Sequence, residues 1–277
     1  MQPIYDFGGN GPVINLAIAN GFPPQTYHPL VDPLTAHYRV VCLLPRPLWG
    51  EPPPTRLMNW RDLIAADLVD GLREHNLQDA ILVGHSFGGV VSMIAALESP
   101  RVRALILLDP TILPGAFNWV LRFSRMFSGG RFANPMVERA EKRQDCFESK
   151  DAAFARFQNK GPFAGWHPDA LRGYADSMIS TDDGEVTLAW SKVWESYIFR
   201  SFYVGSWKHV PQLRGRVPVL VIRGGESDTF MPPAGRRFRQ LVPEATYAEI
   251  PDHGHLFPQS APDATRTLIT DWLNSTK

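Results

Sequence analysis

The chain has 277 residues, of which 44% are hydrophobic and 20% charged, a composition typical of a folded protein with a substantial core. Basic and acidic residues both number 28, so the formal net charge is zero. Together with the lack of a dense basic patch with interleaved aromatic residues, this balance argues against nucleic acid as a partner. The two cysteines, Cys42 and Cys146, indicate neither a disulfide framework nor a metal cluster.

The N-terminal residues lack the basic and apolar regions of a signal peptide. No apolar run approaches the length needed to cross a membrane. From sequence we therefore expect a cytoplasmic protein with no membrane span.

Short apolar runs bounded by turn residues predict strands at 3–8, 13–19, 38–44, 79–82 and 102–108, the first of them at a sheet edge. Helical spacing of apolar residues predicts a helix over 59–75, and apolar density predicts another over 90–98. The order of strands and helices is typical of a mostly parallel sheet that is covered by helices on both faces.

Residues 111–215 interrupt this order and contain no convincing strand. Helices are expected here, among them an exposed one over 136–158 and one over 186–203 that places Trp190, Trp194 and Tyr197 on one face. Most of the aromatic residues in this region are expected to form its own core. We nevertheless take these three as candidate pocket residues, because an inserted lid must present side chains to the site beneath it.

The alternating order resumes after residue 215. The sequence predicts strands at 217–222 and 246–250 and helices at 233–241 and 262–274.

Between the strand 79–82 and the helix 90–98 lies the pattern G-x-S-x-G, centred on Ser86. A strand, this pattern and a helix together are the context of a nucleophile elbow, which needs small residues two before and two after the nucleophile. Gly84 and Gly88 occupy those two positions. Ser86 is therefore the predicted nucleophile.

A serine hydroxyl is a weak nucleophile near neutral pH, so it needs a base, usually a histidine that a carboxylate orients. Both partners should follow strands of the same sheet, where the loops at the carboxyl ends gather. Asp228 follows the strand 217–222 and His255 follows the strand 246–250. The predicted triad is Ser86, Asp228 and His255, in the chain order that accompanies the elbow.

On these motifs the chain resembles the α/β-hydrolase superfamily, and within it the capped branch of esterases, lactonases, C–C bond hydrolases and epoxide hydrolases. The resemblance implies an α/β-hydrolase core over 1–110 and 216–277 and a helical cap over 111–215. Asp109 also ends a strand, and some relatives place their acid there, but Gly-Gly-Glu-Ser-Asp resembles the acid loop and favours Asp228. His253 is the alternative base, yet only His255 has the glycine directly before it that the family's histidine loop has.

The resemblance also implies an oxyanion hole formed by the backbone N–H groups of Phe87 and Phe22. The family usually has His-Gly at the start of the second loop, so Asn20 is a departure that affects side-chain contacts near the hole. Relatives that open epoxides carry aspartate at the elbow, and Ser86 excludes that chemistry.

The loop after the strand 38–44 places Arg46 and Trp49 near the expected pocket rim. Arg46 has two interpretations, a bidentate contact to a substrate carboxylate and a salt bridge that ties the loop to the cap.

The predicted function is a serine hydrolase of a small, largely apolar carboxylic ester or related acyl compound, without a cofactor or metal, as a monomer or homodimer. Activity is expected to fall with pH over the range in which a histidine is protonated, about 6 to 7. Two alternatives stay open. One is a C–C bond hydrolase or lactonase that uses the same triad, and the other is a ligand receptor of the same fold with little turnover.

Overall fold

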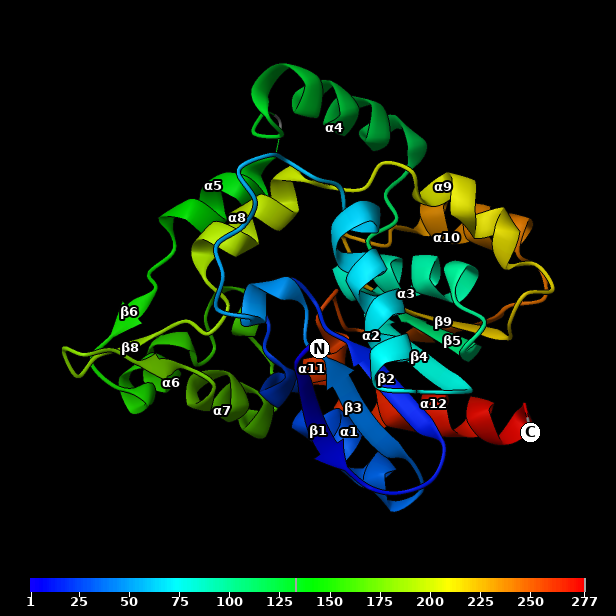
Figure 1. The fold of residues 1–277 in the computed structure, drawn as a ribbon, viewed down its shortest axis with the longest axis horizontal. Coiled ribbons are helices and arrows are strands. Elements are labelled where there is room, and N and C mark those ends of the chain that lie inside the picture. Colours follow the sequence, from blue (N-terminus) through cyan, green and yellow to red (C-terminus); the bar gives the residue numbers. More distant parts are fainter. Residues whose placement is uncertain (133, 277) are drawn as a thin grey trace.

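A computed structural model describes residues 1–132 and 134–276 of the chain. A seven-stranded sheet forms its centre, with the strand order β1-β3-β2-β4-β5-β9-β10 (Figure 1). Every neighbouring pair is parallel except β1 and β3. The strands are β1 (Ile4–Gly8), β2 (Val13–Ala17), β3 (Arg39–Leu43), β4 (Ala80–His85), β5 (Val102–Leu108), β9 (Val219–Gly224) and β10 (Thr246–Ile250).

Helices cover both faces of this sheet. On one face, α2 and α3 pack together, and on the other α1, α11 and α12 pack together. The helices outside residues 111–215 are α1 (His28–Val31), α2 (Ala66–Glu74), α3 (Phe87–Glu98), α10 (Pro232–Leu241), α11 (Phe257–Ser260) and α12 (Pro262–Ser275). The α/β architecture with a mostly parallel sheet is as the sequence predicts, and each predicted strand corresponds to one observed strand within a few residues.

Residues 111–215, which we call the insertion, follow β5 and precede β9 in the chain (Figure 1). The insertion contains α4 (Gly115–Ser128), α5 (Pro135–Lys142), β6 (Cys146–Phe147), α6 (Lys150–Phe157), α7 (Pro168–Asp176), β7 (Ile179–Ser180), β8 (Val186–Thr187), α8 (Lys192–Arg200) and α9 (Ser206–His209).

Three sequence predictions for the insertion are wrong. The helix expected over 186–203 is shorter, since β8 takes up Val186–Thr187 and α8 begins at Lys192, so Trp190 precedes the helix. The region contains a small antiparallel sheet of order β6-β8-β7, although no strand was expected there. Its strands are only two residues long, so they show no alternation of apolar and polar residues. The single helix expected over 136–158 is two helices, α5 and α6, with β6 between them.

The insertion has an aromatic core of its own, which includes Phe147, Phe163, Trp166 and Tyr174. The ring of Phe22, from the loop after β2, packs against this core with its centroid 5.3 Å from that of Trp166. The insertion is thereby held directly over the carboxyl edge of the sheet.

Helix α3 approaches the sheet closely because glycines line its first turn. A Cβ atom placed on Gly88 would lie 2.1 Å from the carbonyl oxygen of Ala17 in β2. A Cβ on Gly84 would lie 2.5 Å from the carbonyl oxygen of Gly88. Only glycine therefore permits this approach, which brings the start of α3 beside the end of β2.

We expect Gly88→Ala to lower the free energy of unfolding by about 1–3 kcal/mol, because the added methyl group must displace backbone. Gly235→Ala in α10 is the matched control, since its Cβ would meet its nearest neighbour at 3.8 Å. There alanine should be neutral or stabilise by up to about 1 kcal/mol through helix propensity. Urea unfolding of both variants measures the difference, and equal effects would contradict the close approach.

Candidate active site

Ser86 stands at the turn between β4 and α3, with φ 58° and ψ −119°. A non-glycine residue at positive φ is strained, and such strain is typical of functional sites. The turn is held by the Ser86 N–H, which donates to the carbonyl of Leu108, and by the Ser86 carbonyl, which accepts from Gly89 and Thr111. Ser86 is 8% exposed, so its hydroxyl lies in a nearly closed site.

His255 connects the serine to a carboxylate, and that carboxylate belongs to Asp109. The Nε2 atom of His255 lies 2.8 Å from Ser86 Oγ, and its Nδ1 atom lies 2.6 Å from Asp109 Oδ2. An ionised carboxylate only accepts hydrogen bonds, so Nδ1 carries the proton and Nε2 accepts from the serine hydroxyl. This is the tautomer in which a histidine can take a proton from serine.

Asp109 is fully buried at the end of β5, with φ 44°. Its carboxylate accepts hydrogen bonds from the N–H of Gly224 and the hydroxyl of Ser227, besides the one from His255. Burial alone would raise the pKa of Asp109, but these hydrogen bonds and the nearby His255 outweigh it and hold the pKa below its usual range.

Asp228 does not contact the histidine, which corrects the predicted partner of His255. Its side chain is exposed and accepts a hydrogen bond from the hydroxyl of Thr229. In the loop after β9, the side chain that turns inward is that of Ser227, and it binds Asp109. The side chains of Ser227 and Asp228 point in opposite directions, so Asp228 faces solvent. The carboxylate beside His255 comes instead from Asp109, at the end of β5.

Thr111 was missed by sequence reasoning. Its hydroxyl lies 3.0 Å from Ser86 Oγ. Because the serine donates its own proton to His255, the Thr111 hydroxyl must be the donor in this contact. The only sequence signal was its position two residues after Asp109.

Tyr27 and His85 were also missed, and both lie beneath the site. The Ala19 N–H donates to the Tyr27 hydroxyl, which lies 2.8 Å from Nδ1 of His85, and Nε2 of His85 lies 3.0 Å from the His255 carbonyl. The N–H can only donate and the carbonyl can only accept, so Tyr27 donates to Nδ1 and His85 donates through Nε2. This chain of hydrogen bonds joins the loop after β2 to the loop that carries His255.

The two expected oxyanion donors differ in their surroundings. Phe87 is the first residue of α3, so its N–H has no acceptor within the helix. The N–H of Phe22 donates to the carbonyl of Ala19 at 3.3 Å, which is longer than an ordinary N–H···O hydrogen bond. Phe22 is therefore weakly engaged in its own turn.

Asn20 joins the loop after β2 to the insertion. Its Nδ2 atom donates to the backbone carbonyl of Glu195 in α8. The Glu195 carboxylate lies against Gly21 and pairs with Arg143, which in turn donates to the Tyr174 hydroxyl. Asn20 thus holds the loop in place, beside a mostly buried ion pair of the insertion.

Arg46 forms a bidentate pair with Asp67 of α2, with distances of 2.6 and 2.8 Å. The expected salt bridge to the cap is therefore wrong, because Asp67 belongs to the core. The same pair uses the two N–H groups with which Arg46 could hold a substrate carboxylate. Trp49 lies beside Arg46 and donates from Nε1 to the carbonyl of Leu44. Both side chains fasten the loop after β3 to the core.

The other candidate pocket residues are buried between the insertion and the core. Trp194 donates from Nε1 to the carbonyl of Glu51, and the Tyr197 hydroxyl donates to the carbonyl of Arg56 and accepts from the N–H of Met58. Trp190 is 1% exposed. The structure gives the polar atoms of Trp194 and Tyr197 a role in attaching α8 to residues 51–58.

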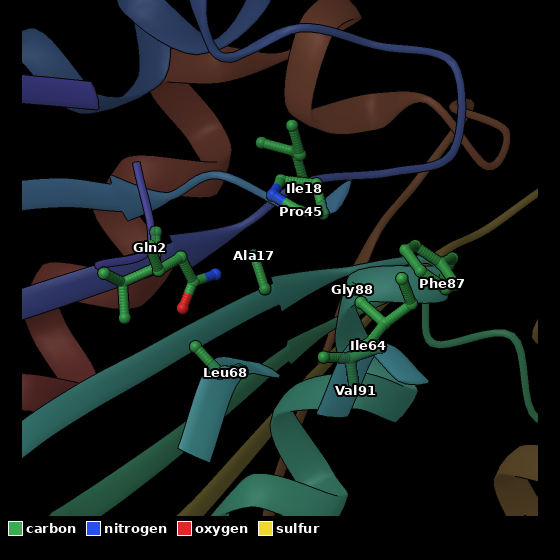
Figure 2. A pocket seen from close by; sticks show the side chains of 10 residues that line it. Gln2, Ala17, Ile18, Pro45, Ile64, Leu68, Phe87, Gly88 and Val91 are labelled. Carbon is green, nitrogen blue, oxygen red and sulfur yellow. The ribbon is translucent and has the colours of Figure 1, made fainter. Parts of the chain in front are cut away.

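A small cavity lies beside the start of α3, bordered by Phe87, Gly88 and the Gln2 side chain (Figure 2). Its volume of about 20 Å³ is enough for roughly one water molecule. It lacks the space for an ester. Among the residues that the structure describes, no group of three or more His, Cys, Asp or Glu side chains could hold a metal ion.

In the described part of the chain, no helix is both long and apolar enough to cross a membrane.

Comparison with known proteins finds a family and a relative that each match most of the chain. The sequence matches the Alpha/beta hydrolase family over residues 16–268. It is 26% identical to Esterase YbfF of Escherichia coli over 230 residues, which are 81% of this chain and 79% of that protein.

Solved structures share the fold as well, among them the following two. One is E-2-(acetamidomethylene)succinate hydrolase, with TM-score 0.75 and 22% identity, where the match covers 98% of this chain and 94% of the other. The second is an enol-lactonase from Burkholderia xenovorans, with TM-score 0.69 and 20% identity, covering 98% and 96%.

The buried His85 makes stability depend on pH. Burial, helped by the nearby His255, lowers the pKa of His85 to about 3 from 6.5. Between these values the unfolded chain binds a proton that the folded chain does not. The contribution of His85 to the free energy of unfolding is therefore largest above pH 6.5. It falls by about 1.4 kcal/mol per pH unit as the pH drops toward 3.

We predict that His85→Gln removes this component of the slope, because an amide does not titrate. The exposed His37 provides the matched control His37→Gln, which should keep the wild-type slope. Urea unfolding at a series of pH values between 6.5 and 4 gives the slopes. If all three proteins had the same slope, the buried neutral histidine would be refuted.

Proposed function

We propose that this chain, which belongs to the alpha/beta hydrolase family, is a serine hydrolase of small, largely apolar carboxylic esters. The observation that carries the proposal is the continuous hydrogen-bond chain from Ser86 through both ring nitrogens of His255 to Asp109. The match to an esterase of Escherichia coli supports the ester as substrate class.

In the proposed reaction, Ser86 Oγ attacks the ester carbonyl carbon while its proton passes to Nε2 of His255. The positive charge that forms on the imidazole is stabilised by the Asp109 carboxylate, 2.6 Å from Nδ1. The tetrahedral intermediate then expels the alcohol, which takes the proton from Nε2 and leaves an acyl-enzyme. Water repeats the sequence on the acyl group, releases the carboxylic acid and restores the serine.

Negative charge on the carbonyl oxygen needs donors that already point at it. The Phe87 N–H is suited to this role, because Phe87 is the first residue of α3 and its N–H has no acceptor within the helix. The Phe22 N–H would have to exchange its long bond with the Ala19 carbonyl for the oxyanion. That exchange costs little, because a hydrogen bond to a charged acceptor is stronger than one to a neutral carbonyl.

The insertion is proposed to act as a cap that sets substrate preference. The Phe22 ring and the Asn20 amide fasten it to the loop that carries the second oxyanion donor. Movement of the insertion would therefore change access to Ser86 and the position of that donor together.

The choice of acid is tested by Asp109→Asn beside Asp228→Asn. With asparagine at 109, the side chain no longer stabilises the imidazolium and no longer fixes its tautomer, so kcat should fall by about 10⁴-fold. Asp228→Asn should leave kcat unchanged, because that side chain is exposed and away from His255. Melting temperatures of both variants separate a loss of folding from a loss of chemistry. If Asp228→Asn lowered kcat and Asp109→Asn did not, Asp228 would be the acid of the triad.

The reaction class is tested with aryl esters of graded acyl length, a lactone and a vinylogous diketone, using wild type and Ser86→Ala side by side. The esters should be the fastest substrates, and Ser86→Ala should lower kcat by roughly 10⁶-fold. If the diketone or the lactone were cleaved faster, Ser86 would still be the nucleophile, but the proposed substrate class would be wrong. Hydrolysis that survives in the variant would overturn the mechanism.

A further inference from the structure

Helix α4, the first helix of the insertion, exposes an unusual number of large apolar side chains. Trp119 and Phe127 are 71% and 69% exposed, and Met126 and Phe123 are 66% and 60% exposed. The helix lies along the outer edge of the insertion, on the side away from the sheet (Figure 1). Exposed apolar side chains that gather on one element indicate a contact surface.

Most of the exposed apolar side chains of α4 form one stripe. At about 100° per residue, five of them fall within an arc of roughly 120°. These five are Trp119, Val120, Phe123, Met126 and Phe127. We call them the α4 stripe.

The opposite side of the helix faces the protein, and its apolar side chains are fewer. Ser124 is buried, Arg125 donates to the carbonyl of Phe202, and Leu121 packs against the core. An amphipathic surface helix ordinarily turns its apolar stripe inward. In α4 the stripe of large apolar side chains points outward instead, so it is free for something outside the protein.

The charge around the stripe selects the kind of surface. Helix α4 contains two arginines and no aspartate or glutamate, although the whole chain has a formal net charge of zero. Arg125 turns inward to the carbonyl of Phe202, and the next arginine along the chain, Arg131, pairs with Glu141. Arg122 is exposed and flanks the stripe, where its apolar stem can lie along the stripe with the guanidinium in water. Tryptophan and phenylalanine beside arginine, without acidic residues, are typical of helices that lie in the surface of an anionic membrane.

A second copy of the chain is the alternative occupant of the stripe. It fits less well, because a two-fold contact between stripes would place Arg122 of both copies at the same interface, where α4 offers no aspartate or glutamate to pair with them.

We propose that α4 docks the protein on anionic lipid membranes, with the α4 stripe buried at the level of the headgroups. The docking does not depend on the proposed hydrolysis. The helix begins at Gly115, six residues after Asp109, so a docked protein would hold its active site close to the lipid surface, where apolar esters also concentrate.

The test is co-sedimentation with vesicles of phosphatidylcholine alone and of phosphatidylcholine mixed with phosphatidylglycerol. The variant Trp119→Ser/Phe123→Ser/Phe127→Ser removes most of the stripe. Ile179→Ser/Val193→Ser is the matched control, since both residues are exposed apolar positions elsewhere in the insertion. Ser86→Ala separates docking from hydrolysis. Activity on a water-soluble ester, or the melting temperature if no ester is cleaved, shows that each variant is folded.

Wild type, the control and Ser86→Ala should bind the phosphatidylglycerol vesicles, and the triple variant should bind at least about tenfold more weakly. Binding should weaken on phosphatidylcholine alone and at high salt, because the charge of the exposed Arg122 contributes. Failure of wild type to bind the anionic vesicles, or equal binding by the triple variant, would overturn the proposal. So would a wild-type dimer in solution that the triple variant dissociates, because the stripe would then be an interface between copies.

Discussion

The buried carboxylate of Asp109 is the interaction on which the site depends. A charge removed from water is costly unless it is paired and hydrogen-bonded. Asp109 meets this need with three donors from two segments: His255 after β10, and Gly224 and Ser227 at the end of β9 and in its following loop. Because one side chain binds all of them, the loops at the carboxyl ends of β5, β9 and β10 are fixed relative to one another. The ring of His255 is thereby aimed at Ser86.

A second set of hydrogen bonds supports the histidine loop from below and joins it to the loop after β2. The backbone of Ala19, the Tyr27 hydroxyl and the His85 ring lead to the carbonyl of His255. Each of these groups is buried and each has a defined donor or acceptor role, so a shift of one leaves another unpaired. Both the loop that carries Phe22 and the loop that carries the histidine are in this way tied to the floor of the site.

The sequence predicted the large sheet well and the loop geometry less well. The inner strands are largely buried apolar runs, and turn residues bound the two edge strands, β1 and β10, so each of the seven could be recognised. The elbow around Ser86 has its own glycine pattern. The acid could not be chosen in this way, because Asp109 and Asp228 both follow strands and only the direction of the loop side chains separates them. The two-residue strands of the insertion left no periodic pattern. The roles of Trp194 and Tyr197 depend on carbonyl groups of residues 51–58, which are more than a hundred residues away.

The proposed mechanism is tested most directly by a crystal structure of the protein after reaction with a small aryl phosphonate, which mimics the tetrahedral intermediate. We expect phosphorus bonded to Ser86 Oγ, a phosphoryl oxygen within hydrogen-bond distance of the Phe87 N–H, and His255 Nδ1 on Asp109 with Asp228 in solvent. Phosphorus on another residue, or a histidine turned to Asp228, would contradict it.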